Sequence, residues 1–394
     1  MPAELFISLL KMGGMAGPNP LGLVPLQTLL IEEPMLVGLR PIALACSLSL
    51  LACPSGEPPE AILGVCGNGV VESGEDCDDG NGASDDDCTA QCAFARCGDG
   101  IVRRDRVHGE PGFESCDDPN DVDETTCRRD CLFAVPAVLG GDRPAFFSLP
   151  PNYDPRQRYP LMVLLHGHGQ TGALINRQMG GEANQEDLNY LLLIPEGTAA
   201  DDGRQFWNAT PACCNFFGSS VDDLAYLSAL IDEAVDRLYG DPKRIYIMGL
   251  SNGGFMAERL ACDAANQVTG IVNVGGSGFL DPTRCRPSTP VTYIRVHGTN
   301  DETIPFEGRH NMPGALACVE RWRQFNGCNE TVETSFVSLD DAVEGNEAHH
   351  QAWTHCQGGS SVHFFPLEGG AHVPRFTPAS RRRLLELVME TIRP

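Results

Sequence analysis

One pentapeptide places a serine where it could act as a nucleophile. Gly249-Leu250-Ser251-Asn252-Gly253 follows the apolar run 244–248, so the serine is expected where a buried strand ends and a helix begins. The flanking glycines permit a tight, strained turn in which larger side chains would collide with neighbouring backbone. Such a turn would hold the Ser251 hydroxyl above a sheet and direct the N–H of Asn252 at a developing oxyanion.

An acid and a histidine follow the serine in an order that suits acyl transfer. Asp301 comes just after the β-rich run 291–296, and His372 comes just after the run 362–367. Both residues are therefore expected past the C-terminal ends of strands, where open α/β sheets place their sites. Ser251 would attack an acyl carbon, His372 would take its proton, and Asp301 would orient and stabilise the imidazole. Taken singly, each has an ordinary alternative as a turn aspartate or a surface histidine.

A glycine-rich loop, His166–Gly172, follows a further buried run at 161–165. A loop in this position can supply a second oxyanion N–H, which we assign to His168. Its paired histidines also invite a metal interpretation, but H-x-H in a loop lacks a third ligand at regular spacing. A second histidine group in a polar stretch, expected to be a loop, has the same weakness: His349, His350 and His355.

Residues 133–394 resemble the secreted α/β-hydrolase esterase family that includes polyhydroxybutyrate depolymerases and feruloyl and acetylxylan esterases. Besides the pentapeptide, the segments that carry the resemblance are Leu161–Gly172, Phe206–Cys214, Val221–Asp223, His297–Asp301 and Gly369–His372. The resemblance implies a doubly wound, mostly parallel α/β sheet in one serine-esterase domain without a cofactor. The family often has a cysteine where this chain has His168, which puts one disulfide of the family in doubt.

The loop 196–219 lies between an expected strand and the helix that precedes the pentapeptide. It contains Trp207 and the vicinal pair Cys213-Cys214, and we expect Trp207 to line the acyl or alcohol pocket. The alternative is a disulfide-pinned surface loop in which Trp207 only packs. Because seven cysteines lie in this part of the chain, at least one of them is unpaired or pairs elsewhere.

Two helices of the esterase-like part have clear sequence signals. Ser220-Val221-Asp222-Asp223 is a variant capping box, and apolar residues at helical spacing follow it until Gly240, the expected stop. Thr377-Pro378 predicts a second helix, with a threonine cap and proline in the first turn. Its apolar positions extend to Ile392.

The rest of the chain predicts export and a separate cysteine-rich module. Residues 1–53 are interpreted as an N-terminal extension and export signal whose short apolar run could not span a bilayer. Leu50–Cys53 resembles a bacterial lipobox, which would make Cys53 a lipid anchor and the protein a surface lipoprotein. The alternative is an ordinary cleaved signal with incidental cysteines. Residues 54–65 are read as a linker.

Residues 66–131 contain an internal repeat with four cysteines in each copy. The copies are Cys66-x10-Cys77-x10-Cys88-x3-Cys92 and Cys97-x18-Cys116-x10-Cys127-x3-Cys131, and they resemble cysteine-rich repeats of myxobacterial surface proteins. Units with so few apolar residues cannot form a hydrophobic core and must rely on cross-links. Disulfides are favoured over zinc because the signal implies an oxidising compartment and no histidine shares the spacing. The spacing does not determine connectivity.

The chain is strongly acidic, and much of its charge lies in this module. The net charge is −25, and residues 66–131 contain 18 acidic and 6 basic side chains. Nucleic acid and anionic membrane surfaces are therefore excluded as partners. Calcium is a possible cofactor of the repeats, and the alternative is a solvated acidic spacer. The oxygen ligands in question are Asp76, Asp78, Asp79, Asn81 and the run Asp85–Asp87.

Together these features predict a secreted or surface-anchored serine carboxylic ester hydrolase that works through an acyl-enzyme. Its expected partners are hydroxycinnamate, acetyl or hydroxyalkanoate esters, and it would meet a membrane only through the lipid anchor. One alternative is a serine peptidase or amidase on the same fold, although the short spans between motifs leave little room for a large lid. The other is a non-catalytic surface interaction protein.

Overall fold

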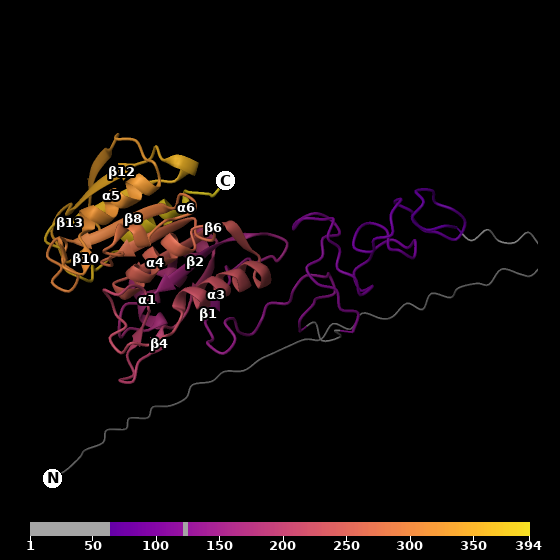
Figure 1. Cartoon of the computed structure of the whole chain (residues 1–394), viewed down its shortest axis with the longest axis horizontal. Coiled ribbons are helices and arrows are strands. Elements are labelled where there is room, and N and C mark those ends of the chain that lie inside the picture. Colours follow the sequence, from indigo (N-terminus) through magenta and orange to yellow (C-terminus); the bar gives the residue numbers. More distant parts are fainter. Residues whose placement is uncertain (1–63, 121–124) are drawn as a thin grey trace, which may run out of the picture. The chain divides into compact units, whose positions relative to one another are not determined.

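A mixed sheet of nine strands organises the C-terminal part of the chain (Figure 1). The computed structural model of the protein describes residues 64–120 and 125–394. Across the sheet the strands are β1 (Phe146–Ser148), β3 (Leu191–Ile194), β2 (Tyr159–Leu165), β6 (Gly240–Leu250), β7 (Gly270–Val274), β8 (Thr292–Gly298), β13 (Val362–Leu367), β12 (Ala348–Trp353) and β11 (Glu333–Val337). The strands from β3 to β13 pair in parallel, and β1, β12 and β11 are antiparallel edges.

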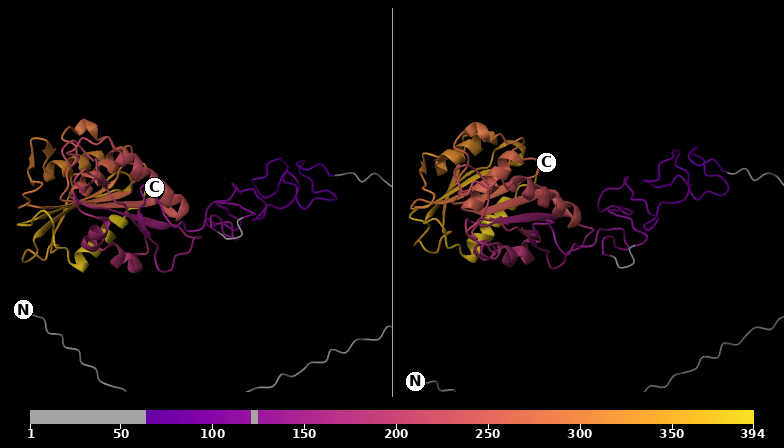
Figure 2. Two further views of the ribbon diagram at one scale, coloured as in Figure 1. Left: turned by 90° about the horizontal axis from the view of Figure 1, so that it is seen from below. Right: turned by 60° about the horizontal axis from the view of Figure 1, so that its bottom comes forward.

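Helices cover both faces of this sheet, as the views in Figure 2 show. One face is covered by α3 (Asp223–Arg237), α4 (Asn252–Asp263) and α5 (Ala315–Phe325). The other face is covered by α1 (Gly172–Met179), α2 (Gly181–Leu188) and α6 (Pro378–Met389). The predicted α/β class with a doubly wound, mostly parallel sheet is confirmed.

The position of strand β2 between two cores explains why its sequence is apolar. Leu161, Val163 and Leu165 pack into one core, whereas Met162 and Leu164 pack into the other. Side chains alternate across a strand, so a strand covered on both faces must be apolar throughout. A continuous apolar run therefore marks the interior strands that carry the site.

The predicted start of α6 is confirmed, whereas the capping box at Ser220 places the start of α3 two residues too early. Asp222 caps α3 by accepting the N–H of Ala225, and Thr377 caps α6 by accepting the N–H of Ser380. The predicted ends are wrong by a few residues. Gly240 begins β6 instead of stopping α3, and Ile392 lies exposed beyond the end of α6.

Four short strands and two 3-10 turns complete the esterase-like part. They are the pair β4 (Thr198–Ala199) and β5 (Gln205–Phe206), the pair β9 (Gly308–Arg309) and β10 (Met312–Pro313), and the turns Pro282–Arg284 and Gln357–Gly359. Among the described residues, no helix combines the length and the apolar character that crossing a membrane would need.

The two cysteine-rich repeats share one disulfide pattern, in which the first cysteine pairs with the fourth and the second with the third. The bonds are Cys66–Cys92, Cys77–Cys88, Cys97–Cys131 and Cys116–Cys127. The prediction that cross-links hold these units is confirmed.

The aspartate after the second cysteine has a structural role in both repeats. The Asp78 carboxylate accepts the backbone N–H groups of Gly67, Asn68, Gly69 and Gly80 at 2.7–3.1 Å. Burial opposes ionisation of Asp78, but these four hydrogen bonds lower its pKa below the ordinary value. In the second repeat, Asp117 accepts the N–H groups of residues 98–100 in the same way. These contacts explain why both copies combine a Cys-Gly-x-Gly opening with an aspartate beside the second cysteine.

Three further disulfides lie in the esterase-like part: Cys213–Cys214, Cys262–Cys285 and Cys328–Cys356. Cys318 is buried and is the one free cysteine among the described residues, so the expected odd cysteine is confirmed. The disulfides fit an extracellular protein. The predicted export signal and the lipobox at Cys53 lie outside the described residues.

His349 and His350 lie on strand β12, so the expectation of a loop is wrong for these two, whereas His355 lies in a loop as expected. His350 is buried, and its Nε2 lies 3.1 Å from Nδ1 of His363 on the neighbouring strand β13. The other His363 nitrogen lies 2.9 Å from the Ser361 hydroxyl. Burial lowers the pKa of His350 to about 4 and that of His363 to about 3.

This buried pair predicts a loss of stability in mild acid. Unfolded histidines titrate near 6.5, so the fold is fully stabilised above that pH and loses stability as the pH falls toward 4. Keeping one imidazole neutral at pH 5 costs about 2 kcal/mol. We expect His363→Gln to lose about 2 kcal/mol less unfolding free energy than wild type between pH 7 and pH 5 in urea titrations. An unchanged pH dependence would contradict this explanation, and exposed His355→Gln is the control.

Candidate active site

Ser251 sits at the sharp turn between β6 and α4. Its φ of 55° lies in the left-handed region, and its N–H donates to the Val274 carbonyl at 2.8 Å. A Cβ on Gly249 would lie 2.1 Å from the Gly253 carbonyl oxygen, and one on Gly253 would lie 2.0 Å from the Leu165 carbonyl oxygen. Only glycine fits either position, which is the packing reason for the glycines around Ser251.

The structure brings Ser251, His372 and Asp301 together in one hydrogen-bonded row. His372 Nε2 lies 2.9 Å from Ser251 Oγ, and His372 Nδ1 lies 2.7 Å from Asp301 Oδ2. Asp301 is 4% exposed, and the His372 side chain is 17% exposed. The order and spacing match a serine that is activated by a base which an acid orients.

Asp301 is held as a carboxylate by several donors. Its Oδ1 accepts the N–H groups of Thr303 and Ile304 at 2.9 and 2.8 Å. Burial opposes ionisation, but the hydrogen bonds from His297, His372 and Ile304 outweigh it and keep the pKa of Asp301 well below its ordinary value. Asp301 therefore stays charged at neutral pH and can stabilise a cationic His372.

The loops after β8 and β13 lie against each other because the two strands are neighbours in the sheet. The N–H of Asn300 donates to the Gly370 carbonyl at 2.9 Å, and the N–H of Thr299 donates to the Leu367 carbonyl at 2.9 Å. A Cβ on Gly298 would lie 2.2 Å from the Gly370 oxygen, so the loops meet at backbone distance. These contacts fix the position of Asp301 relative to His372.

A buried chain of polar side chains extends behind Asp301. Arg295 and His297 both lie on β8 and are at most 1% exposed. Arg295 can only donate, so its Nη2, 2.8 Å from His297 Nδ1, leaves the His297 proton on Nε2. That N–H faces the Ile304 carbonyl at 2.7 Å and Asp301 Oδ2 at 3.4 Å. Burial, opposed by the hydrogen bond to Asp301, lowers the pKa of His297 and keeps the ring neutral.

His297 is therefore expected to position Asp301 without touching a substrate. Replacing His297 with phenylalanine removes the donor to Asp301 Oδ2, and we expect kcat to fall about tenfold to a hundredfold with little change in KM. Steady-state kinetics on a p-nitrophenyl ester measures kcat and KM separately. The His297→Gln variant should retain part of the wild-type kcat. An unchanged kcat in a folded His297→Phe protein would contradict this role.

Asn252 and His168, which were predicted to donate oxyanion N–H groups, belong to two segments that adjoin Ser251. Asn252 is the first residue of α4, directly after the serine. Gly167, the neighbour of His168, lies against Ser251, since a Cβ on Gly167 would be 3.4 Å from Ser251 Cβ. The loop His166–Gly172 thus adjoins the serine, and the donor roles of Asn252 and His168 stay predictions.

Trp207 does not line a pocket, and the prediction that it does so is corrected. Its side chain is 0% exposed, and its indole N–H donates to the His166 carbonyl at 3.0 Å. The Asn252 side chain accepts the backbone N–H of Trp207 at 2.7 Å and donates to its carbonyl at 3.0 Å. Trp207 therefore packs the loop before α3 against the start of α4, which is the alternative role.

His166 does not present a free nitrogen to a metal. Its Nε2 accepts the Gly197 N–H at 2.9 Å, and its Nδ1 lies 2.8 Å from the Gly167 carbonyl. The ring is fully buried, and burial lowers its pKa. His168 is half-buried, and its ring packs edge-on against Phe216 with centroids 5.5 Å apart.

Calcium at the repeats is a prediction that the acidic residues fit poorly. Glu75, Asp78 and Cys92 have ligand atoms within 4.8 Å of one another, but Cys92 is in a disulfide and Asp78 already holds four backbone N–H groups. Asp87 is paired with Arg103 and Arg106. In the group formed by Glu75, Asp78 and Cys92, Glu75 Oε1 is the oxygen that has no hydrogen-bond partner among the described residues. Calcium takes about six to eight oxygen ligands, so this group offers too few.

Chelation tests this point directly. We expect the melting temperature of the protein to be the same in EGTA and in calcium-containing buffer, because four backbone N–H donors already satisfy the Asp78 carboxylate and arginines pair with Asp87. A scanning calorimetry run in each buffer makes the measurement. A clear fall of the melting temperature in EGTA would establish calcium as a structural ligand and contradict this expectation.

A family model described as Phospholipase/Carboxylesterase matches residues 219–330. Feruloyl esterase B of Piromyces equi is 24% identical over 224 residues, which cover 53% of this chain and 39% of that protein. The bifunctional acetylxylan esterase/xylanase XynS20E of Neocallimastix patriciarum is 23% identical over 235 residues, covering 60% of this chain and 31% of that protein.

Among solved structures, the acetyl xylan esterase from Aspergillus awamori aligns with a TM-score of 0.46 and 13% identity. The alignment covers 62% of this chain and 94% of that structure. The chain spans less than half the length of the two curated relatives named above.

Proposed function

We propose that this chain is an exported serine carboxylic ester hydrolase with the α/β-hydrolase fold. The observation that carries the proposal is the position of His372, which is hydrogen-bonded to Ser251 on one side and to Asp301 on the other. A buried carboxylate, a partly exposed imidazole and a serine on a strained turn form the set of groups that acyl transfer requires.

The tautomer of His372 decides which atom acts as the base. Asp301 can only accept, so the His372 Nδ1 proton faces it and the Nε2 lone pair faces Ser251 Oγ. Nε2 takes the hydroxyl proton as Oγ attacks the ester carbonyl carbon, and the resulting imidazolium is stabilised by Asp301. The oxyanion is received by the N–H groups of Asn252 and His168.

Collapse of the tetrahedral intermediate breaks the bond to the alcohol oxygen. His372 Nε2 gives its proton to that oxygen, and the acyl group remains on Ser251 as an ester. Water then attacks the acyl-enzyme with His372 again as base, which releases the acid and restores the serine. No cofactor takes part in these steps.

The substrates that we propose are hydroxycinnamate, acetyl or hydroxyalkanoate esters. Relatives named as feruloyl and acetylxylan esterases support the first two classes. The hydroxyalkanoate class rests on the resemblance of the sequence motifs. We also propose export, in support of which the described part of the chain contains seven disulfides.

Lipid attachment at Cys53 is the surface-anchored form of this proposal. Mass spectrometry of the mature protein tests it, because a lipidated Cys53 would be the first residue of the chain. An unmodified N-terminus beyond Cys53 would contradict the anchor and leave the esterase proposal intact.

A substrate panel tests the proposed reaction. We expect the purified protein to hydrolyse p-nitrophenyl acetate and at least one of methyl ferulate, an acetylated xylo-oligomer and a hydroxybutyrate oligomer. Acetanilide serves as the amide control and should be cleaved far more slowly. Cleavage of the amide at a rate similar to the esters would favour an amidase, and inertness toward every ester would overturn the proposal.

A further inference from the structure

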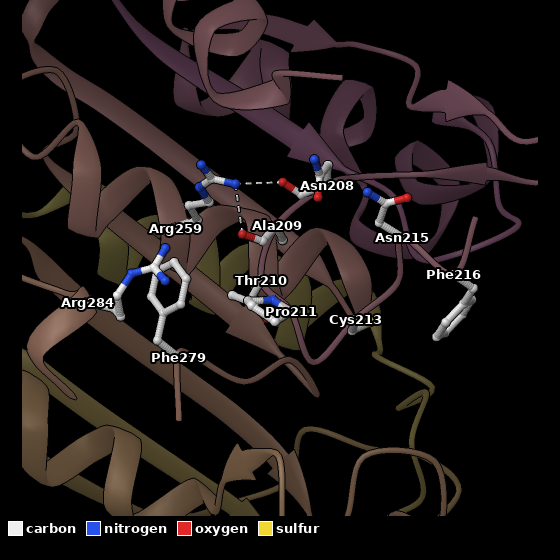
Figure 3. Close-up of a pocket in the computed structure, with 10 residues that line it drawn as sticks. All are labelled: Asn208, Ala209, Thr210, Pro211, Cys213, Asn215, Phe216, Arg259, Phe279 and Arg284. Carbon is white, nitrogen blue, oxygen red and sulfur yellow. Dashed lines mark hydrogen bonds between the residues drawn. The ribbon is translucent and has the colours of Figure 1, made fainter. Parts of the chain in front are cut away.

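A pocket of about 260 Å³ is enclosed by the loop before α3, by α4 and by the segment after β7 (Figure 3). The loop before α3 lines it with Asn208, Thr210 and Phe216, α4 contributes Arg259, and the segment after β7 contributes Phe279 and Arg284. Pockets for drug-sized ligands are about 300–1,000 Å³, so this one suits a single sugar or hydroxyacid unit.

Two contacts join this pocket to the groups around Ser251. Asn208 directly follows Trp207, whose backbone is hydrogen-bonded on both sides to the Asn252 side chain. Phe216 packs against the edge of His168, the residue assigned to the oxyanion loop. Both contacts connect residues of the pocket wall to residues that adjoin Ser251.

The pocket is positively charged in a protein of net charge −25. Its lining contains two arginines and no acidic residue. Two nitrogens of the Arg259 guanidinium already have partners. Nη1 donates to the Asn208 and Ala209 carbonyls, as Figure 3 shows. Nε donates to the Asp263 carboxylate at 3.3 Å. It is therefore held in place in the wall, and the ion pair with Asp263 balances part of its charge.

Arg284 is the group that is free to bind. Its guanidinium carbon lies 5.2 Å from the centroid of the Phe279 ring, and its side chain makes no hydrogen bond or ion pair to any described residue. Arg284 also lines an adjoining pocket of about 340 Å³, whose one acidic lining residue is Asp281. The Asp281 carboxylate is hydrogen-bonded to Thr283, so Arg284 keeps its planar set of N–H donors for a ligand.

We propose that this pocket binds a carboxylate carried by the ester substrate, with Arg284 as the contacting residue and Arg259 as a fixed positive wall. The inference rests on the proposed esterase function and adds a substrate class to it, the anionic esters. A guanidinium fork pairs with a carboxylate through two parallel hydrogen bonds, and Phe216 and Phe279 supply apolar walls for the carbons that carry it. Two sources provide this chemistry: a uronate substituent on an acetylated xylo-oligomer and the terminal carboxylate of a hydroxybutyrate oligomer.

Binding to the Ser251→Ala protein tests the proposal, because the ester then stays intact during calorimetric titration. One arm compares an acetylated xylo-oligomer with and without a glucuronate substituent. The other compares the 3-hydroxybutyrate dimer as free acid and as methyl ester. We expect the acid form of at least one pair to bind about fivefold more tightly than its neutral partner. The arm that responds identifies the source of the carboxylate.

Arginine variants then assign the preference to the pocket. Arg284→Gln, added to Ser251→Ala, should remove the preference for the acid form, and Arg284→Lys should retain part of it. Arg286→Gln changes the net charge equally at an exposed position outside the pocket and should keep the preference. Equal binding of acid and neutral forms, or an equal loss in the Arg284→Gln and Arg286→Gln proteins, would overturn the proposal. Hydrolysis of p-nitrophenyl acetate by wild type separates this outcome from failure of the esterase function.

Discussion

Replacing Ser251 with alanine is expected to lower kcat for p-nitrophenyl acetate by about 10⁵-fold to 10⁶-fold, close to the rate without a nucleophile. The hydroxyl lies 2.9 Å from His372 Nε2, so its loss removes the atom that accepts the acyl group. Alanine adopts the positive φ of this turn no less readily than serine, so the variant should fold.

Progress curves at high enzyme concentration measure this loss. Ser228→Ala is the matched control, because it removes a serine hydroxyl from α3, outside the candidate active site. If the folded Ser251→Ala protein retained more than about a hundredth of wild-type kcat, a loss of less than 3 kcal/mol in transition-state stabilisation, another group would have to be the nucleophile.

Asp301→Asn is expected to lower kcat by about 10⁴-fold with a small effect on KM. The amide oxygen can keep the N–H groups of Thr303 and Ile304, which leaves the amide NH₂ facing His372. His372 Nδ1 must then accept a hydrogen bond, so the ring proton moves to Nε2 and no lone pair faces Ser251. The variant therefore keeps the shape of the wild-type site, but its His372 ring carries the proton on the wrong nitrogen.

Two measurements separate this explanation from simple misfolding. The melting temperature of Asp301→Asn should stay within a few degrees of wild type, because its backbone donors remain satisfied. His372 should still be present and ordered, so a serine-directed phosphonate should label the variant slowly. A kcat that falls less than tenfold would show that Asp301 does not orient the base.

Much of the site could be predicted because its residues come directly after the ends of strands. Apolar residues dominate β2, the second half of β6, β8 and β13, since these strands are buried on both faces. Whatever follows such a run lies at the same edge of a parallel sheet, which is why Ser251, Asp301 and His372 could be grouped. The sequence does not say that β8 and β13 are neighbours, and this pairing is what brings Asp301 to His372.

The polar chain behind Asp301 was missed for a physical reason. Arg295 and His297 alternate with Ile294 and Val296, so the segment reads as a half-exposed strand with one polar face. The structure buries both faces, and Arg295 lies 2.8 Å from His297 Nδ1 and 3.8 Å from the Glu258 carboxylate. An arginine and a histidine two residues apart in an interior strand are the signal that could have indicated a buried network.

The prediction for Trp207 failed in the opposite direction, because a residue expected to line a pocket is buried. A tryptophan in a long loop near the site suggested a pocket wall, but the Asn252 side chain and the His166 carbonyl hold it inside the molecule. Those partners come from segments that are distant in the sequence, so composition alone could not reveal them. The aromatic residues that line the neighbouring pocket are Phe279 and Phe216, and Phe216 is 69% exposed.

Trapping the acyl-enzyme tests the central claim most directly. The protein is mixed with excess p-nitrophenyl acetate, quenched in acid within the first turnovers, digested and analysed by mass spectrometry. The proposed mechanism predicts one added acetyl group on the peptide that contains Ser251, and none on that peptide in Ser251→Ala. An acetyl group on another residue, with the Ser251 peptide unmodified while ester is being hydrolysed, would contradict it.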